Sequence, residues 1–366
     1  MSDQLLVSTP GRICLFGEHQ DYLGLPVIAA AISKRIQITG HRRTDNRVLI
    51  HMPDIGKTES FKLLPELTYD RKRDYFKSAI TVLRRDENIR FSYGFEGTIH
   101  GNIPINAGAS SSSALVITWI NFLLQMADIP QSRSQEEIAR LAHRAEVLEF
   151  GEPGGMMDHY ATAVGHVIYL ESEPAIRLEP LTPNLGSFVL GDSGQPKDTL
   201  GILKRVKYGM LDALDKVRQF DPAFDLHTTP LEEADTYRTQ LSPDELSLLK
   251  SNLSDRDILR EAKTLLTSTL RNDALLGDLL NRHQNNLRDA KRISTPKIDR
   301  MLDAAMAAGA LGGKINGSGG GGCIFAYAPT NPEVVVEAIE RQGAKAYLIS
   351  MAEGTHVMNL EEVEPS

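Results

Sequence analysis

Near its N-terminus the chain reads Gly11-Arg-Ile-Cys-Leu-Phe-Gly-Glu-His-Gln-Asp-Tyr-Leu-Gly24, directly after a short apolar stretch. The segment places four ionisable side chains within ten residues, namely Arg12, Glu18, His19 and Asp21. A folding core has no use for so many charges at a strand-to-loop junction, because unpaired buried charges cost free energy. His19 alone would be read as a structural histidine. Beside two carboxylates it instead suits a polyol, whose neighbouring hydroxyls each need a hydrogen-bond partner.

The composition is typical of a globular protein, with 41% hydrophobic and 24% charged residues among 366. A chain of this length suits two domains of ordinary size. The net charge of -8 leaves no basic surplus for a nucleic-acid backbone or an anionic membrane. We therefore expect neither a nucleic-acid partner nor a membrane partner.

The cysteines and the hydropathy pattern favour a reducing, cytoplasmic setting. Cys14 and Cys323 are the only cysteines, lie far apart in the sequence and flank apolar residues. They predict two buried, reduced thiols rather than a disulfide. No basic region precedes an apolar run at the start, so no signal peptide is expected. The most apolar stretch, residues 114–127, is too short to span a bilayer.

Local patterns predict α+β structure in both halves, with mixed sheets and a junction near residue 185. Apolar or alternating stretches predict strands at 27–38, 47–52, 91–99, 167–170 and 188–190. A buried helix is predicted at 110–127. A second begins at a capping box of Ser134 and Glu137 and buries Ile138, Leu141, Ala142 and Ala145. Polar-faced helices are expected at 200–218 and intermittently over 231–292. Helices and strands then alternate through 298–308, 323–328, 332–342 and 346–351.

A second polar segment reads Pro104-Ile-Asn-Ala-Gly-Ala-Ser-Ser-Ser-Ser-Ala-Leu115. A glycine-containing turn that runs into a buried helix directs unpaired N–H groups and the positive helix end at one point, which suits an anion. The serine hydroxyls add donors and a possible magnesium ligand. No Gly-Lys-Ser/Thr follows, so this is not a Walker A loop. An N-cap with surplus serines is the alternative.

Two carboxylates and a glycine run extend the polar set. Glu146 lies at the edge of a buried helix stripe, where it is either a surface charge or a group aimed into a cleft. Asp158 lies in Gly154-Gly-Met-Met-Asp-His159 and could serve as a helix N-cap, as a site carboxylate, or as both. Near the C-terminus, Lys314-Ile-Asn-Gly-Ser-Gly-Gly-Gly-Gly-Cys-Ile324 could be a flexible linker. The helix expected before it and the apolar strand after it favour an ordered turn.

Together these segments resemble the three motifs of the GHMP superfamily of small-molecule kinases, in family order. The first matches every polar position and all three glycines of the galactokinase motif G-R-x-x-x-x-G-E-H-x-D-Y-x-x-G. The serine-rich segment resembles P-x-x-x-G-L-S-S-S-A, with Ala109 at the Leu position and Ser113 at the Ala position. Gly155 to Asp158 resembles G-I-M-D-Q, with His159 replacing Gln. The glycine run resembles M-T-G-x-G-F-G-G-C, with Gly320 at the Phe position.

The resemblance implies a two-domain GHMP kinase fold with the active site in the cleft between the domains. Residues 1–185 would form an N-terminal ribosomal-protein-S5-like domain, and residues 186–366 a C-terminal ferredoxin-like domain. It also implies ATP-dependent phosphorylation of a sugar hydroxyl, with the anomeric hydroxyl of galactose or a related sugar as the leading acceptor. ATP and Mg²⁺ would be required, and the protein would be a monomer or a small homo-oligomer.

The resemblance also assigns roles to residues. Asp158 would accept the proton of the sugar hydroxyl, while Arg12 would keep Asp158 ionised and stabilise the transferring phosphoryl group. The sugar ligands would be Arg12, Glu18, His19, Asp21, Gly155, Asp158 and, at a poorly matched position, Tyr208. ATP would lie on Gly108, Ala109, Ser110, Ser111, Ser112 and Ser113. Mg²⁺ would be held by Glu146 and Ser112, with Ser111 as the alternative hydroxyl.

One part of the galactokinase pattern is missing. Where that family has a strand ending in Asn-Ser, then a Tyr and a paired-Arg stretch, this chain has Asp192-Ser193-Gly-Gln-Pro-Lys-Asp-Thr199 and Lys204-Arg-Val-Lys-Tyr208. The pattern Ser-Gly-x-Pro-x-x-Thr resembles the mevalonate kinase branch, which lacks the Asp-Tyr pair after Glu-His. A mevalonate-kinase-like enzyme acting on a non-sugar alcohol therefore stays open. So does a non-catalytic, galactokinase-like sugar sensor, although the intact serine run and Asp158 argue against it.

Overall fold

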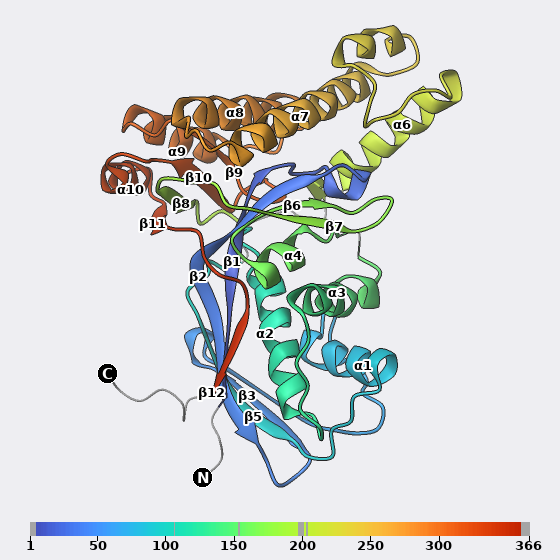
Figure 1. Ribbon diagram of the computed structural model, residues 1–366, viewed down its shortest axis with the longest axis vertical. Coiled ribbons are helices and arrows are strands. Elements are labelled where there is room, and N and C mark those ends of the chain that lie inside the picture. The colour runs from blue at the N-terminus through green and yellow to red at the C-terminus, as the bar shows by residue number, and fades with distance from the viewer. Residues whose placement is uncertain (1–4, 106, 153, 197–200, 203, 360–366) are drawn as a thin grey trace.

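The computed structural model describes residues 5–105, 107–152, 154–196, 201–202 and 204–359 (Figure 1). Within them the larger sheet contains β1 (Leu5–Phe16), β2 (Val27–Arg42), β3 (Arg47–Met52), β4 (Lys57–Lys62), β5 (Phe95–Gly101), β6 (Val167–Glu171), β7 (Arg177–Leu181) and β12 (His356–Asn359). Its path is β12-β1-β2-β5-β3-β4, with β6 between β2 and β7. β3 and β5 run parallel and β1 and β2 antiparallel, so the predicted mixed sheet is confirmed.

The smaller sheet is antiparallel and has the order β11-β8-β10-β9. Its strands are β8 (Phe188–Asp192), β9 (Gly312–Ile315), β10 (Cys323–Tyr327) and β11 (Lys345–Ile349). The helix α9 (Pro296–Ala307) precedes β9, and α10 (Pro332–Glu340) links β10 to β11. Helices α9 and α10 pack on this sheet, which is the arrangement of a ferredoxin-like unit. The predicted fold class is therefore confirmed.

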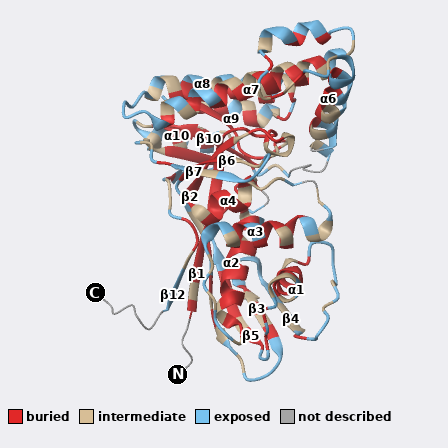
Figure 2. Ribbon diagram, turned by 45° about the vertical axis from the view of Figure 1, so that its right-hand side comes forward, coloured by how far each residue is buried: buried red, intermediate tan, exposed pale blue. Residues whose placement is uncertain are grey.

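Helices cover one side of the larger sheet. They are α1 (Tyr75–Glu87), α2 (Ser111–Met126), α3 (Gln135–Glu146) and α4 (Met157–Val164). Helix α2 lies against β1 and β2 and is buried nearly all round, as its apolar sequence predicted (Figure 2). The capping box of Ser134 and Glu137 forms at the start of α3, whose predicted core residues are buried. Helix α2 thereby holds its N-terminal serines rigidly against the sheet.

Three further helices lie on the far side of the smaller sheet from the N-terminal part (Figure 1). They are α6 (Gly209–Phe220), α7 (Pro243–Thr267) and α8 (Asp273–Asn285). Helix α8 packs on β9, α7 packs on α8, and α6 packs on α7. The short turn η4 (Lys204–Tyr208) leads into α6, η5 (Leu231–Tyr237) lies between α6 and α7, and η6 (Asn286–Ala290) follows α8. The helix predicted from Leu200 starts outside the described residues, and 204–208 form a π-helical turn. The remaining one-turn segments are η1 (Asp21–Leu23), η2 (Pro53–Ile55) and η3 (Leu148–Phe150).

The predicted boundary after residue 185 falls between β7 and β8, which belong to different sheets. The last described strand departs from that division, because β12 returns to pair with β1 in the larger sheet. Both cysteines are buried free thiols, as predicted. Among the described residues, no helix is long and apolar enough to cross a bilayer.

Candidate active site

An ion pair between Arg12 and Asp158 lies where the larger sheet meets α4. Arg12 lies on β1, and its Nε and Nη2 are 2.8 and 2.7 Å from Oδ1 of Asp158. The Arg12 side chain is 4% exposed, whereas that of Asp158 is 33% exposed. Burial opposes ionisation of Asp158, but the ion pair outweighs it and lowers the pKa of this carboxyl. Asp158 is therefore an ionised carboxylate that a substrate can reach.

Arg12 also joins the three motifs. Its Nη1 donates to the carbonyl of Gly108, and its backbone N–H donates to the carbonyl of Ala109 at 3.2 Å. Asn316, from the third glycine run, donates from Nδ2 to the same Gly108 carbonyl at 2.9 Å. The Asn316 Oδ1 accepts from the N–H of Cys14 at 2.9 Å. Segments 300 residues apart in sequence thus meet at one guanidinium.

The serine-rich segment has the geometry of an anion-binding loop. Gly108 and Ser110 have φ values of 89° and 59°, so the chain turns sharply into α2. Ser110 is the N-cap residue of α2 but its side chain makes no cap bond. The residue is buried, and its hydroxyl helps to lower the pKa of Asp158. Ser111 to Ser113 form the first helical turn, where N–H groups have no intrahelical acceptor. An anion such as a nucleotide phosphate would satisfy these donors.

Asp21 meets the start of α4 at Gly155. A Cβ built on Gly155 would lie 1.6 Å from Oδ2 of Asp21, so only glycine fits there. Burial, together with the charge of Asp158, raises the pKa of Asp21 to about 6. Asp21, Gly155, Asp158 and Arg12 therefore lie together, and their role as sugar ligands stays a prediction.

We expect Gly155→Ala to remove substrate binding at this cluster, because the methyl group would displace the Asp21 carboxylate. The KM for the acceptor should rise by about 100-fold or more, as expected when a buried polar contact of a substrate is lost. Steady-state kinetics would measure this. Gly151→Ala is the control for backbone strain alone, since Gly151 has a left-handed φ of 61° but nothing lies within 4 Å of a Cβ built there. An unchanged KM in Gly155→Ala would contradict this placement.

Glu18 and His19 form polar contacts with residues of the C-terminal half. Glu18 accepts from Nζ of Lys314 on β9, which also donates to the Cys14 carbonyl at 2.9 Å. His19 bonds through Nδ1 to Oη of Tyr22 at 2.8 Å and through Nε2 to the carbonyl of Ser318 at 3.0 Å. The second oxygen of Glu18 is buried and lacks a partner among the described residues. The role of Glu18 and His19 as sugar ligands stays a prediction.

Glu146, the predicted metal ligand, lies at the end of α3 and is buried. Its Oε2 is 2.8 Å from Nε2 of His159, the residue that replaces the usual glutamine. Ser112 is exposed on the first turn of α2. Among the described residues, no hydrogen bond joins Glu146 to Ser112, and no cluster of three or more His, Cys, Asp or Glu side chains could hold a metal.

Tyr208 is 48% exposed, and no hydrogen bond or ring contact among the described residues links it to the cluster. Its neighbour Lys207 lies closer, with Nζ 5.0 Å from the centre of the Tyr22 ring. Sequence reasoning missed Lys207 and Lys314. The signal for Lys314 was its place at the start of the glycine run, and Lys207 lay in the stretch that matched its family poorly.

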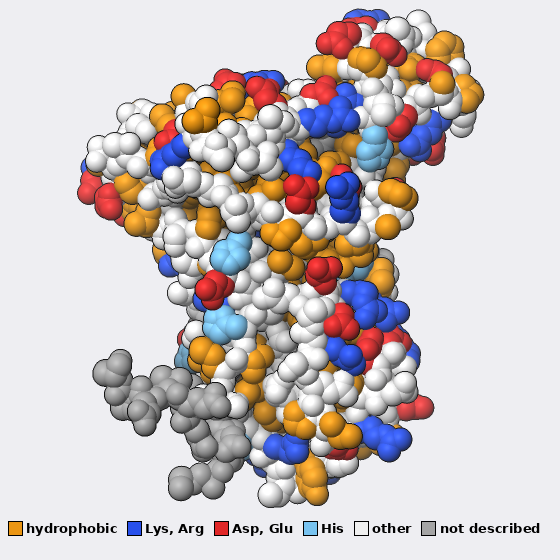
Figure 3. Space-filling view, in the orientation of Figure 1, with side chains coloured by type: hydrophobic (Ala, Val, Ile, Leu, Met, Phe, Trp, Pro, Cys, Tyr) orange, Lys and Arg blue, Asp and Glu red, His pale blue; other side chains and the backbone are white. Residues whose placement is uncertain are grey.

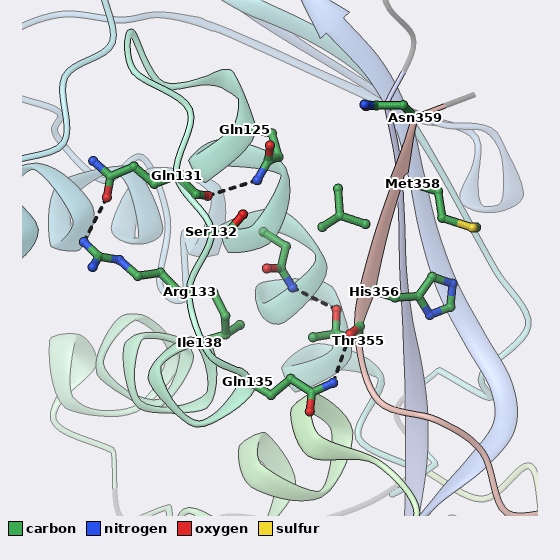
Figure 4. Close-up of a pocket in the computed structure, with 12 residues that line it drawn as sticks. Gln125, Gln131, Ser132, Arg133, Gln135, Ile138, Thr355, His356, Met358 and Asn359 are labelled. Atoms are coloured by element: carbon green, nitrogen blue, oxygen red, sulfur yellow. Dashed lines mark hydrogen bonds between the residues drawn. The ribbon is translucent and has the colours of Figure 1, made fainter. Parts of the chain in front are cut away.

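The charge distribution on one face of the molecule and a separate cavity complete the description of the surface. On the face in Figure 3, acidic and basic side chains are interspersed, without an extended basic patch. A separate cavity of about 590 Å³ lies between the second half of α2 and β12 (Figure 4). Its lining is mainly amides and hydroxyls and includes none of the predicted site residues.

Comparisons with known proteins agree with this geometry. The model of the GHMP kinases N-terminal domain matches residues 74–166, that of the GHMP kinases C-terminal domain matches 262–352, and the galactokinase galactose-binding signature matches 2–42. The mevalonate kinase of Thermococcus gammatolerans is 30% identical, over 99% of this chain and 100% of its own length. The galactokinase of Pasteurella multocida is 27% identical, over 94% of this chain and 89% of its own.

The fold has close structural neighbours. The Lactococcus lactis galactokinase, solved with galactose, superposes with a TM-score of 0.83 at 23% identity, covering 96% of this chain and 95% of its own. The Methanococcus jannaschii mevalonate kinase has a TM-score of 0.72 at 18% identity, covering 95% and 98%. A two-domain fold with a phosphate loop beside an Arg–Asp pair defines a small-molecule phosphotransferase. The chain belongs to the GHMP kinases, which use ATP.

Proposed function

We propose that this kinase transfers the γ-phosphoryl group of ATP to a sugar hydroxyl, with the anomeric C1 hydroxyl of galactose or a related sugar as the leading acceptor. The observation that carries the proposal is the position of the Asp21 carboxylate, which lies against Gly155 and beside Asp158. Two carboxylates side by side accept hydrogen bonds from several hydroxyls of one substrate, which suits a polyol. The match of residues 2–42 to a galactose-binding signature supports the same substrate class.

The chemistry follows from the ion pair. Phosphoryl transfer needs an in-line hydroxyl and a stabilised phosphate charge, and little covalent chemistry from the protein. Asp158 is ionised and partly exposed, so it can accept the proton of the attacking hydroxyl. Arg12 orients that carboxylate through its Nε and Nη2, and its positive charge lies beside the phosphate loop.

The donors of residues 108–113 suit the nucleotide phosphates, because the N–H groups of the first turn of α2 have no intrahelical acceptor. Glu146 and Ser112 would hold Mg²⁺ through oxygen atoms, the ligands this ion prefers, and few protein ligands are needed because phosphates and water supply the rest. Bound there, Mg²⁺ would neutralise phosphate charge. Gly108 to Ser113 would orient the triphosphate toward Asp158.

A second candidate is phosphorylation of a non-sugar alcohol such as mevalonate. It is favoured by the archaeal mevalonate kinases, which share 27–30% identity with this chain over nearly its whole length. Asp21 argues for the sugar, because a second carboxylate next to Asp158 accepts a hydrogen bond from a sugar hydroxyl but repels the carboxylate of mevalonate.

Release of ADP should be measured over a panel of galactose, N-acetylgalactosamine, arabinose, glucuronate and mevalonate. We expect turnover on galactose or another neutral sugar of the panel. Turnover on mevalonate alone would replace the proposal with the second candidate. No turnover on any member, together with galactose-stimulated binding of a partner protein, would favour a sugar sensor.

The reaction should depend on pH through Asp21. Its pKa is raised to about 6, so the carboxyl gains a proton as the pH falls through 6 and then stops acting as a pure acceptor. We expect kcat/KM for the sugar to fall about tenfold per pH unit below pH 6. Asp21→Asn should lower kcat/KM at neutral pH and abolish this acid limb. An identical acid limb in Asp21→Asn would assign it to another group.

A further inference from the structure

The C-terminal half contributes two lysines to the sugar-binding cluster, Lys314 beside Glu18 and Lys207 beside Tyr22. Lys207 lies on η4, the π-helical turn that leads into α6, and its side chain is half-buried. Its Nζ lies 5.0 Å from the centre of the Tyr22 ring, within the range of a cation–π contact. Its charge also helps to lower the pKa of Asp21 against the effect of burial. The position of Nζ over the Tyr22 ring therefore places Lys207 beside the sugar motif.

The Tyr22 ring, over which the Lys207 ammonium lies, is held in position by its own contacts. The Tyr22 Oη bonds to Nδ1 of His19 at 2.8 Å, and the two rings meet edge to face at 5.9 Å. The backbone N–H of Tyr22 donates to Oδ1 of Asp21 at 2.9 Å. The ring under the ammonium and the carboxylate beside it are therefore held by one short segment, residues 19–22. An ammonium resting on this segment has little freedom to move away from Asp21.

Donor and acceptor are complementary at this point. A carboxylate only accepts hydrogen bonds, and an ammonium offers three donors and no acceptor. A sugar hydroxyl does both, so one hydroxyl of a vicinal pair can donate to Asp21 while it or its neighbour accepts from Lys207. The formal charges at the cluster balance, with Arg12, Lys207 and Lys314 opposite Glu18, Asp21 and Asp158. A balanced set favours an uncharged polyol over a carboxylate substrate.

We propose that Lys207, rather than Tyr208, is the specificity-determining residue from the C-terminal half, and that it reads a hydroxyl of a neutral sugar next to Asp21. This inference rests on the proposed function and deepens it. The substrate class becomes a neutral sugar with a vicinal diol that contacts Asp21 and Lys207. Tyr208 is 48% exposed and points to no contact in the cluster.

The test compares Lys207→Met with Lys204→Met, which removes an exposed lysine of the same turn. With galactose, Lys207→Met should raise KM by about 10- to 100-fold and change kcat little, because a charged hydrogen bond to the substrate is lost. Lys204→Met should resemble the wild type. Tyr208→Phe should lose less than Lys207→Met, and a larger loss in Tyr208→Phe would overturn the proposal.

Deoxy sugars distinguish a direct contact between Lys207 and a sugar hydroxyl from a structural role of Lys207. If Lys207 bonds a ring hydroxyl, then one of 3-deoxygalactose and 4-deoxygalactose should bind wild type and Lys207→Met with nearly equal KM, because the contact is already missing. A similar KM increase on all three sugars would show a structural role and refute the inference. If the wild type phosphorylates no sugar, the proposed function has failed. If it does and Lys207→Met is normal, only this inference has failed.

Discussion

Asp158→Asn is expected to abolish turnover while sugar binding stays largely intact. The amide keeps the size of the carboxylate and an oxygen that can still accept from Arg12, so the site should keep its shape. It cannot take the proton of the attacking hydroxyl. We expect kcat to fall by about 10³-fold or more, the scale of a lost general base. Rapid-quench turnover and calorimetric galactose binding measure the two properties separately.

Asp54→Asn is the control for this substitution, since Asp54 is exposed and pairs with His100 far from the cluster in sequence. It should leave kcat unchanged. Turnover near the wild-type level in Asp158→Asn would mean that another group accepts the proton. Loss of galactose binding together with turnover would mean that the carboxylate binds the sugar rather than acting as base.

Arg12→Met is expected to have the second-largest effect. The substitution leaves the Gly108 carbonyl and the Asp158 carboxylate without their main donor. Burial then outweighs the smaller opposing contributions of His159 and Ser110 and raises the pKa of Asp158, so more of the base is protonated at a given pH. We expect kcat to fall by about 10³-fold near neutral pH, because both the ionised base and a charge beside the phosphate are lost.

The pH profile distinguishes this mechanism from simple damage. Activity that remains in Arg12→Met should increase as the pH is raised through the new pKa of Asp158, whereas the wild type should show only the acid limb of Asp21. Arg43→Met is the matched control, since Arg43 is also paired with carboxylates, Asp45 and Glu96, but outside the cluster. A flat pH profile in Arg12→Met would contradict the assigned coupling of Arg12 to Asp158.

Local features of the fold were predictable because they depend on short stretches of sequence. Strand β3 occupies the predicted residues, and the capping box at Ser134 forms because both partners lie within one helical turn. Strand β12 was not predicted. It has four residues and owes its conformation to pairing with β1, some 350 positions away in sequence, and no local pattern encodes that pairing.

In the site too, contacts between residues far apart in the sequence could not be predicted from local patterns. Arg12 and Asp158 are 146 residues apart, and their pairing was predicted only through a family resemblance. The pairing of Glu18 with Lys314 was not predicted, because a buried lysine in a glycine-rich run carries no periodic signal. The place expected for Tyr208 is approached by Lys207, since the π-helical turn of η4 changes which side chain faces the N-terminal half.

A crystal structure with galactose, Mg²⁺ and a non-hydrolysable ATP analogue tests the central claim most directly, which is that one cleft brings together the base, the phosphate loop and the sugar cluster. We predict the anomeric hydroxyl about 3 Å from the Asp158 carboxylate, facing the γ-phosphate on residues 108–113. A second sugar hydroxyl should contact Asp21. Galactose bound elsewhere, or a γ-phosphate pointing away from Asp158, would contradict the account.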